Sequence, residues 1–137
     1  MRITRIRKKI LSFFKKQKKP ITYNKIVDYL KKSNFNFDRS TVFRNLNFLE
    51  KEGIIQKLNF GDGVSRYELI REDNHHHHIV CLNCKKTIDF FNKDLDRLIK
   101  KIEKKFKKNK KFKIRSHQFE FFGYCQNCSY FKNSLKI

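Results

Sequence analysis

The sequence has no alanine, no tryptophan and a single proline, and no apolar run approaches the ~18 residues that a membrane-spanning helix needs. Near the basic N-terminus, the apolar segment at residues 10–14 is too short for a secretory signal peptide. These absences predict a cytoplasmic location and no membrane partner. In that reducing compartment the four cysteines suggest metal binding rather than disulfides.

Acidic residues are also scarce, 13 against 34 basic ones, which gives a net charge of +21. Such a charge favours nucleic acid as a partner, because Lys and Arg release counterions when they neutralise phosphates. The excess is spread evenly, with 17 basic and 6 acidic residues in 1–70 and 17 and 7 in 71–137. Abundant Lys, Asn, Ile and Phe are also typical of AT-rich coding, which adds surface lysine without a functional reason. Charge therefore supports DNA binding without proving it.

Apolar residues recur at helical spacing three times within residues 1–53, which predicts three helices. The second has a candidate N-cap at Thr22, and the third has one at Asp38 or Ser40 and ends at Gly53. The predicted inward-facing residues are Ile3, Ile6, Ile10 and Phe13, then Ile26, Val27 and Leu30, and finally Val42, Leu46 and Leu49.

The outer face of the third helix is polar, and after that helix two β-rich runs flank Gly61-Asp62-Gly63, a strong hairpin signal. Three helices followed by a hairpin predict a winged helix-turn-helix, whose polar helix face suits the major groove. The alternative is an ordinary surface helix, since any such helix has polar residues outside. The candidate DNA-binding residues are Ser40, Thr41, Phe43, Arg44 and Asn47.

The second half has the pattern β-β-α-β, after a charged connector at residues 71–74. Its helix is predicted from helical spacing of apolar residues, and its last strand from the aromatic run before the final cysteine pair. The whole chain is therefore expected to have an α+β fold. The apolar residues of the predicted helix are Leu95, Leu98, Ile102 and Phe106.

The four cysteines form two Cys-x-x-Cys pairs, which is the most specific signal in the chain. Each pair can place two thiolates on one tetrahedral cation, so two pairs complete a structural zinc site. Forty residues separate the pairs, more than the ~15 to 20 of a zinc ribbon, so a β-α-β excursion must lie between them. Two disulfides or a redox dithiol are the alternatives. The residues are Cys81, Cys84, Cys125 and Cys128.

Four consecutive histidines precede the first cysteine pair. Because successive side chains of a strand point to opposite faces, His75 and His77 should face one way and His76 and His78 the other. The run therefore predicts two half-sites with different partners, unless it is an unstructured polar loop. Other candidate ligands are Glu68, Asp89, Asp96 and His117.

With these motifs in place, the chain resembles the ferric uptake regulator family of metal-dependent bacterial repressors. The motifs TVFRNLNFLEKEGII, SRYEL, HHHHIVCLNCKKTIDF and HQFEFFGYCQNC match that family in order and spacing. The resemblance implies a winged-helix DNA-binding domain at 1–70, a hinge at 71–74 and a small α/β metal-binding dimerisation domain at 75–137. It also implies a homodimer that binds an AT-rich palindromic operator of double-stranded DNA and controls metal uptake or homeostasis genes.

The resemblance also divides the ligands among three sites. It implies structural Zn2+ on the four cysteines, a sensor metal at the hinge and a second metal site within the dimerisation domain. The hinge metal would be Zn2+ or Fe2+, with Mn2+ as a further alternative. The hinge ligands are Glu68, His76, His78 and Asp89, and those of the second site are His75, His77, Asp96 and His117.

The chain departs from the family pattern at several positions. Lys19 and Pro20 stand where many members have a histidine that completes the hinge site, and residues 1–74 contain none. Phe43 replaces a tyrosine of the recognition helix, and His77 replaces a frequent aspartate. The missing histidine argues against a five-coordinate Fe or Mn site, and the short tail after Cys128 resembles zinc-sensing members.

Two other classes of protein compete with this interpretation. The even spread of charge favours a zinc-stapled RNA-binding or ribosome-associated protein. An enzyme would need a nucleophile or general base beside an open metal site, and the sequence offers neither, so no catalytic residue and no small organic substrate are expected.

Overall fold

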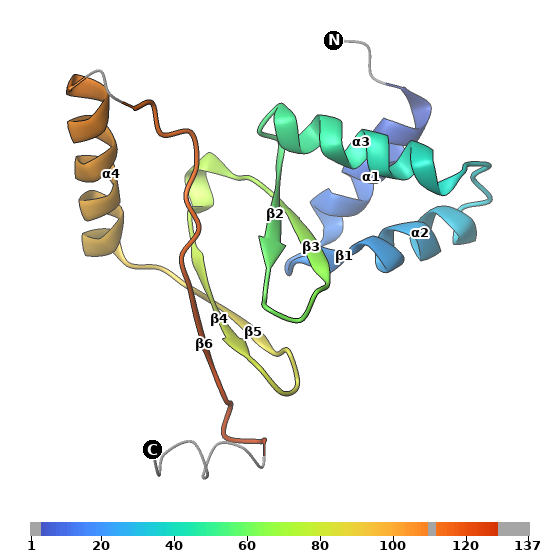
Figure 1. The fold of residues 1–137 in the computed structure, drawn as a ribbon. Helices are drawn as coiled ribbons and strands as arrows, with labels where there is room; N and C mark the ends of the chain where they lie inside the picture. The colour runs from blue at the N-terminus through green and yellow to red at the C-terminus, as the bar shows by residue number, and fades with distance from the viewer. Residues whose placement is uncertain (1–3, 110–111, 129–137) are drawn as a thin grey trace. The chain divides into compact units, whose positions relative to one another are not determined.

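The computed structural model describes residues 4–109 and 112–128, and the chain divides into two compact units, Met1–Asp73 and Asn74–Ile137 (Figure 1). In the described residues the first unit combines three α-helices with a three-stranded sheet, and the second combines one α-helix with another three-stranded sheet, which confirms the predicted α+β class. None of the helices in the described residues combines the length and apolarity that crossing a bilayer requires.

The first unit contains three helices and a hairpin. Its elements are α1 (Arg5–Lys16), β1 (Ile21–Thr22), α2 (Tyr23–Lys32), α3 (Arg39–Lys51), β2 (Ile55–Asn59) and β3 (Ser65–Leu69). Side-chain oxygens of Thr4, Thr22 and Asp38 accept hydrogen bonds from the first turns of α1, α2 and α3, so each helix begins at a capping residue. The sheet order is β1-β3-β2 and both pairings are antiparallel. This is the predicted winged helix, to which the unpredicted two-residue β1 adds an edge strand.

Most of the predicted inward-facing residues are buried. All six from α2 and α3 are in the core, together with Ile10 of α1. Ile6 and Phe13 are partly buried against this core, and the Phe13 ring stacks on Tyr29 with centroids 4.2 Å apart. Phe14, which was not predicted, is the fully buried phenylalanine, 1% exposed. Both adjacent phenylalanines therefore contact the core, and helical spacing alone did not show which of them is fully buried. Ile3 lies outside the described residues.

A buried polar residue, Asn45, connects α1 to α3. Its Nδ2 donates to the Thr41 carbonyl at 2.8 Å, and its Oδ1 accepts from Arg7 Nε at 3.0 Å. The Arg7 guanidinium also lies over the Phe48 ring, 3.8 Å from its centroid. These contacts satisfy the buried amide and fix the rotation of α3 relative to α1.

Glycines form the turns of this unit where the backbone becomes left-handed. Gly53 (φ +74°) follows α3, and Gly61 (φ +78°) and Gly63 (φ +74°) form the tip of the hairpin. Asp62 forms an ion pair with Arg66 of β3 at 2.9 Å, which braces the tip. The hairpin predicted from Gly61-Asp62-Gly63 is confirmed.

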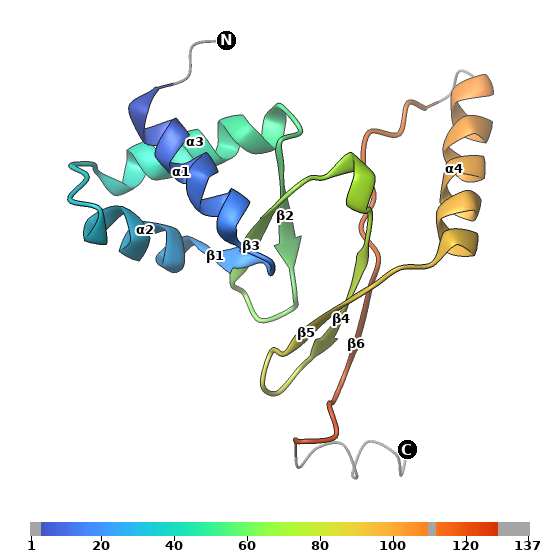
Figure 2. The same cartoon turned by 180° about the vertical axis from the view of Figure 1, so that it is seen from behind.

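The second unit follows a short 3-10 helix (Glu72–Asn74) and has the predicted β-β-α-β order. Its elements are β4 (His77–Cys81), β5 (Thr87–Phe90), α4 (Lys93–Lys108) and β6 (Glu120–Gly123). β5 pairs with β4 antiparallel, and β6 pairs with β4 on its other side in parallel. Figure 2 shows β6 returning alongside β4 after α4. The fold thus brings the C-terminal cysteine pair to the end of β4.

Candidate metal sites and DNA-contacting surface

The four cysteine sulfurs lie together at the end of the β4–β6 pair. Sγ–Sγ distances are 3.6 Å for Cys81–Cys128, 3.7 Å for Cys84–Cys125 and 3.4 Å for Cys125–Cys128. A tetrahedral zinc ion with ~2.3 Å bonds holds its sulfurs about 3.8 Å apart, so the cluster fits a closed structural site. All four cysteines are free in the structure, which favours this arrangement over two disulfides.

The parallel pairing of β4 with β6 explains how pairs forty residues apart meet. Cys81 is the register partner of Gly123, and the Leu82 N–H donates to the Gly123 carbonyl at 2.8 Å. Each cysteine pair then continues into its own turn beyond the paired strands. After β5 and α4, the chain therefore returns as β6 beside β4, which brings the second cysteine pair next to the first.

The pKa values of the cysteine thiols favour a bound cation in the cluster. Backbone N–H groups of Cys125 and Cys84 lower the pKa of the Cys81 thiol to about 6. The Asn83 side chain lowers the pKa of Cys128, but the neighbouring Cys125 and Cys81 thiols raise it to about 11. Neighbouring sulfurs therefore oppose full ionisation, and a divalent cation among them would remove that penalty.

The histidine run separates into two pairs on opposite faces, although only His77 and His78 lie within β4. The rings of His75 and His77 meet edge to face with centroids 4.9 Å apart. Those of His76 and His78 do the same on the other face, also at 4.9 Å. Each pair has different neighbours, so the run forms two separate candidate sites.

The first pair lies with His117 and Asp96. His77 Nε2 is 3.3 Å from Asp96 Oδ1, His75 Nε2 is 3.6 Å from the same oxygen, and His117 Nε2 is 3.2 Å from His75 Nε2. Metal–ligand bonds of ~2.0 to 2.2 Å hold neighbouring ligand atoms about 3.4 Å apart in a tetrahedron. The three imidazoles lie close enough together to hold one ion, and Asp96 lies beside two of them, His75 and His77. Burial lowers the pKa of His75, which favours the neutral imidazole that binds metals.

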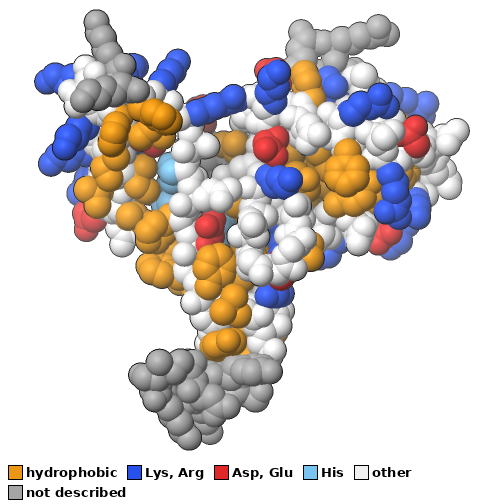
Figure 3. Space-filling view, viewed as in Figure 1, with side chains coloured by type: hydrophobic (Ala, Val, Ile, Leu, Met, Phe, Trp, Pro, Cys, Tyr) orange, Lys and Arg blue, Asp and Glu red, His pale blue; other side chains and the backbone are white. Residues whose placement is uncertain are grey.

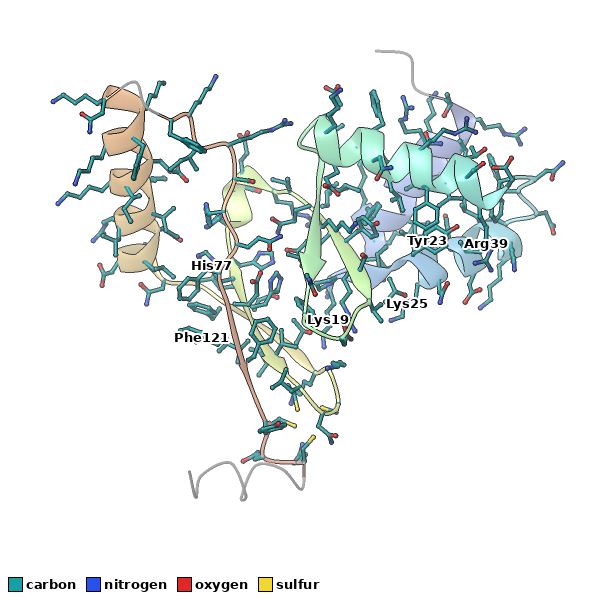
Figure 4. The ribbon with its side chains drawn as sticks, viewed as in Figure 1. Lys19, Tyr23, Lys25, Arg39, His77 and Phe121 are labelled. Atoms are coloured by element: carbon teal, nitrogen blue, oxygen red, sulfur yellow. The ribbon has the colours of Figure 1, made fainter. Side chains whose placement is uncertain are left out.

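Two aromatic rings enclose this site. The His77 ring (labelled in Figure 4) lies 5.4 Å from the Phe90 ring and 5.6 Å from the Phe119 ring between centroids, and His77 is only 3% exposed. The site therefore combines three imidazoles and one carboxylate with a partly apolar wall. This donor set is richer in nitrogen than one with aspartate at position 77 and is suited to zinc.

Glu103 of α4 is a neighbour of this site that sequence reasoning missed. Its Oε1 lies 3.4 Å from His117 Nδ1, while His117 Nε2 faces His75. A carboxylate on the second nitrogen of a ligating histidine fixes its tautomer and ring orientation. Helical spacing could have revealed it, since Glu103 is seven residues after Asp96 and lies on the same side of α4.

The second pair lies near two carboxylates of the second unit. Asp89 Oδ1 is 3.9 Å from His76 Nε2 and 3.8 Å from His78 Nε2, distances that a shared cation can span. Glu120, which the sequence analysis did not single out, places Oε1 4.0 Å from His78 Nδ1. The remaining hinge candidate, Glu68, belongs to β3 of the first unit, where its Oε1 accepts from Gln56 Nε2 at 2.6 Å.

The outer face of α3 contains the five predicted DNA-contacting residues. Phe43 is 45% exposed, and Arg44 and Asn47 are exposed as well. The Ser40 and Thr41 hydroxyls instead donate to Asp38 Oδ1 at 2.7 and 2.8 Å. These two bonds and the Thr41 N–H lower the Asp38 pKa to about 2, so that carboxylate stays ionised as the helix cap. The two hydroxyls thus serve the cap, and the other three side chains face solvent.

Comparison with known proteins identifies the family. The model of the ferric uptake regulator family matches residues 1–122. The chain is 39% identical to the ferric uptake regulation protein of Bacillus subtilis over 92 residues, which are 66% of this chain and 59% of that protein. It is 32% identical to the peroxide operon regulator of Bacillus subtilis over 129 residues, 94% of this chain and 85% of that one.

Solved structures agree with the sequence matches. The Helicobacter pylori ferric uptake regulator Fur, described as having three functional metal binding sites, superimposes with a TM-score of 0.73 and 29% identity, covering 93% of this chain and 82% of that one. The ferric uptake regulator of Francisella tularensis with iron gives 0.71 and 27%, covering 93% and 94%. The chain therefore belongs to the ferric uptake regulator family, whose members are metal-responsive transcription regulators and not enzymes.

Proposed function

We propose that this protein is a homodimeric repressor that binds an AT-rich palindromic operator when a divalent cation occupies its hinge site. The observation that carries the proposal is the separation of the histidine run into two pairs with different carboxylate partners. One pair has its ligands within the second unit. The other has Asp89 and Glu120 beside it there, and the family resemblance implies that Asp89 and, from the first unit, Glu68 are its carboxylate ligands.

The domains follow from this assignment. Residues 1–70 are the DNA-binding domain, 71–74 the hinge and 75–137 the dimerisation domain. Support for DNA binding comes from α3, because Phe43, Arg44 and Asn47 share an exposed face that a major groove can receive. The likeness to dimeric DNA-binding repressors supports the same assignment.

Dimerisation is supported by apolar side chains that the second unit leaves exposed. α4 has no buried residue, and Figure 3 shows apolar side chains gathered over the described part of this unit. A surface on which many large apolar side chains are exposed together marks an interaction site, and a second copy of the chain would cover it. Exposed apolar residues of this unit include Ile79, Ile88, Leu98, Ile102, Phe106 and Phe121.

The regulatory mechanism rests on the position of the hinge ligands in the chain. Glu68 lies near the end of the wing, whereas His76, His78 and Asp89 follow the 71–74 connector. A cation held by all four would favour the arrangement of the two domains in which both recognition helices of the dimer reach successive major grooves. Because such coupling is reciprocal, DNA would strengthen metal binding by the same factor. The candidate cations are Zn2+, Fe2+ and Mn2+, since imidazole and carboxylate ligands suit all three.

Two double variants test this mechanism. His76→Ala with His78→Ala should remove most of the effect of metal on DNA affinity, a loss of about 5- to 150-fold. The dimer and the zinc on the four cysteines should remain. His75→Ala with His77→Ala should mainly lower metal stoichiometry or dimer stability and should retain most of the coupling. Fluorescence anisotropy with a labelled operator duplex at fixed salt measures the coupling.

The two variants are matched controls for each other. Each removes two histidines that share one face, and both pairs come from the same four-residue segment. Equal loss of coupling in both would show that the run acts as one flexible cluster. That result would contradict a separate hinge site.

Glu103 provides a further prediction at the second site. Glu103→Gln should weaken metal binding there by about 10- to 100-fold, because the His117 ring would lose the carboxylate that orients it. Competition with a chromophoric zinc chelator measures the affinity. Asp94→Asn is the matched control, since Asp94 is also on α4 but is 91% exposed and pairs with Arg97. Equal affinities of Glu103→Gln and the unmodified protein would remove Glu103 from the site.

A further inference from the structure

An aromatic pair joins α2 to the outer face of α3. Tyr23 is the first residue of α2, and its ring stacks on the ring of Phe43 with centroids 4.2 Å apart and planes 8° from parallel. Tyr23 is half-buried, whereas Phe43 is 45% exposed. One face of the Phe43 ring is therefore covered by Tyr23, and the rest of the ring remains available to a ligand.

Several contacts fix the Tyr23 side of the stack. The Thr22 side chain accepts from the Lys25 N–H at 3.3 Å and caps α2, which sets the position of its first residue. The Tyr23 hydroxyl donates to the Arg39 carbonyl at 3.4 Å, at the start of α3. The Tyr23 ring is thus attached to both helices, and Phe43 is held against it without a polar group of its own.

The surroundings of the stack are basic. Figure 4 shows Tyr23 close to Arg39, Lys25 lies in the same first turn of α2 as Tyr23, and Arg44 adjoins Phe43 in the sequence. In Figure 3 an apolar patch on the α2–α3 face of the first unit has Lys and Arg side chains along its border. An exposed aromatic ring within a basic border suits a nucleic acid, whose phosphates bind the cations while a base contacts the ring.

We propose that Tyr23 is a positioning residue for base recognition: its ring holds Phe43 in the orientation in which α3 contacts the C5-methyl group of thymine. This inference rests on the proposed binding of DNA by α3. A phenylalanine cannot read a base through hydrogen bonds, so its selectivity depends on apolar contact with the thymine methyl. An unsupported ring at an exposed helix position would sample several rotamers, and the stack removes that freedom.

The test compares thymine with deoxyuridine, which lacks only the methyl group. The probe is an AT-rich palindromic duplex selected from a random pool by the unmodified, metal-loaded protein, and the same duplex with deoxyuridine in place of thymine. The unmodified protein should prefer thymine by about 4-fold for each methyl buried against Phe43, or about 15-fold for one methyl in each of two half-sites. Phe43→Ala should reduce this ratio, the affinity for the thymine duplex divided by that for the deoxyuridine duplex, toward 1.

Tyr23→Ala should reduce the ratio nearly as far as Phe43→Ala does, whereas Tyr23→Phe, which keeps the stack, should retain it. Lys25→Ala is the matched control in the same helical turn and should weaken both duplexes equally, as expected for a phosphate contact. Tyr23→Leu replaces Tyr23→Ala if thermal unfolding shows that the alanine variant does not fold.

The outcomes separate the inference from the proposed function. If the unmodified protein selects no duplex, DNA binding itself fails. If it binds DNA but does not prefer thymine, or if Tyr23→Ala keeps the ratio while Phe43→Ala loses it, the role of Tyr23 is overturned and DNA binding stands. Loss of the ratio in Tyr23→Phe would likewise overturn it, because the hydroxyl and not the stack would then be responsible.

Discussion

Replacing Cys81 with serine should remove one zinc ion per chain and unfold the second unit. Fifteen buried hydrophobic residues form the described core, and only Val80 and Cys81 of them belong to the second unit. So little buried apolar surface cannot offset the entropy of ordering that unit. Binding of structural zinc contributes about 10 to 16 kcal/mol in small zinc domains, which exceeds the net stability of many domains of about 5 to 15 kcal/mol.

The measurements are zinc content by inductively coupled plasma mass spectrometry, helix content by circular dichroism and dimer mass by analytical ultracentrifugation. Cys125→Ser should behave like Cys81→Ser, because each variant removes one ligand of the same four-cysteine cluster, Cys81 from the first Cys-x-x-Cys pair and Cys125 from the second. Asn127→Ser is the matched control, since Asn127 is exposed and lies between Cys125 and Cys128. Full zinc content and an intact dimer in both cysteine variants would contradict the four-cysteine assignment.

Replacing Arg44 with alanine should abolish specific operator binding and leave the metal content unchanged. Arg44 is exposed on the outer face of α3, and its Nη2 is only 3.3 Å from the Thr41 hydroxyl, a local contact that leaves most of its donors available. A bidentate contact of arginine with guanine is worth about 1 to 3 kcal/mol of base discrimination, or about 5- to 150-fold. In a dimer the loss occurs at both half-sites, which would reduce binding to the non-specific level.

Lys104→Ala is the control for Arg44→Ala, because Lys104 has the same charge but lies on α4 of the second unit. It should change operator affinity little when both are measured at the same salt concentration. If the two variants weaken binding equally, affinity comes from the evenly spread charge and not from α3. The RNA-binding alternative would then be preferred.

Local signals in the sequence were sufficient to predict most of the first unit. Thr22 and Asp38 are caps, and Gly53, Gly61 and Gly63 end a helix or form a turn, because each acts through its own backbone. The choice between Phe13 and Phe14 could not be made in this way. It depends on how α1 is rotated against the rest of the core, and the buried Asn45–Arg7 contact that helps to fix this rotation joins residues far apart in the chain.

In the candidate sites, too, the features that depend on local sequence could be predicted, and those that depend on tertiary packing could not. The alternation of side chains could separate His75 and His77 from His76 and His78, since it is a local property of extended backbone. Glu103 and Glu120 could not be assigned to a particular histidine, because their contacts depend on how α4 and β6 return to β4. The Tyr23–Phe43 stack is non-local in the same sense, as it depends on the packing of α2 against α3.

The most direct test of the proposed regulation is the operator affinity of the unmodified dimer with and without a hinge metal. Protein that retains its four-cysteine zinc is stripped of other metals and titrated with the selected AT-rich palindrome at fixed salt, alone and with Zn2+, Fe2+ or Mn2+. At least one metal should tighten binding by about 5- to 150-fold, and the duplex should tighten binding of that metal by the same factor. Equal operator affinity with and without each of the three metals would contradict metal-dependent repression.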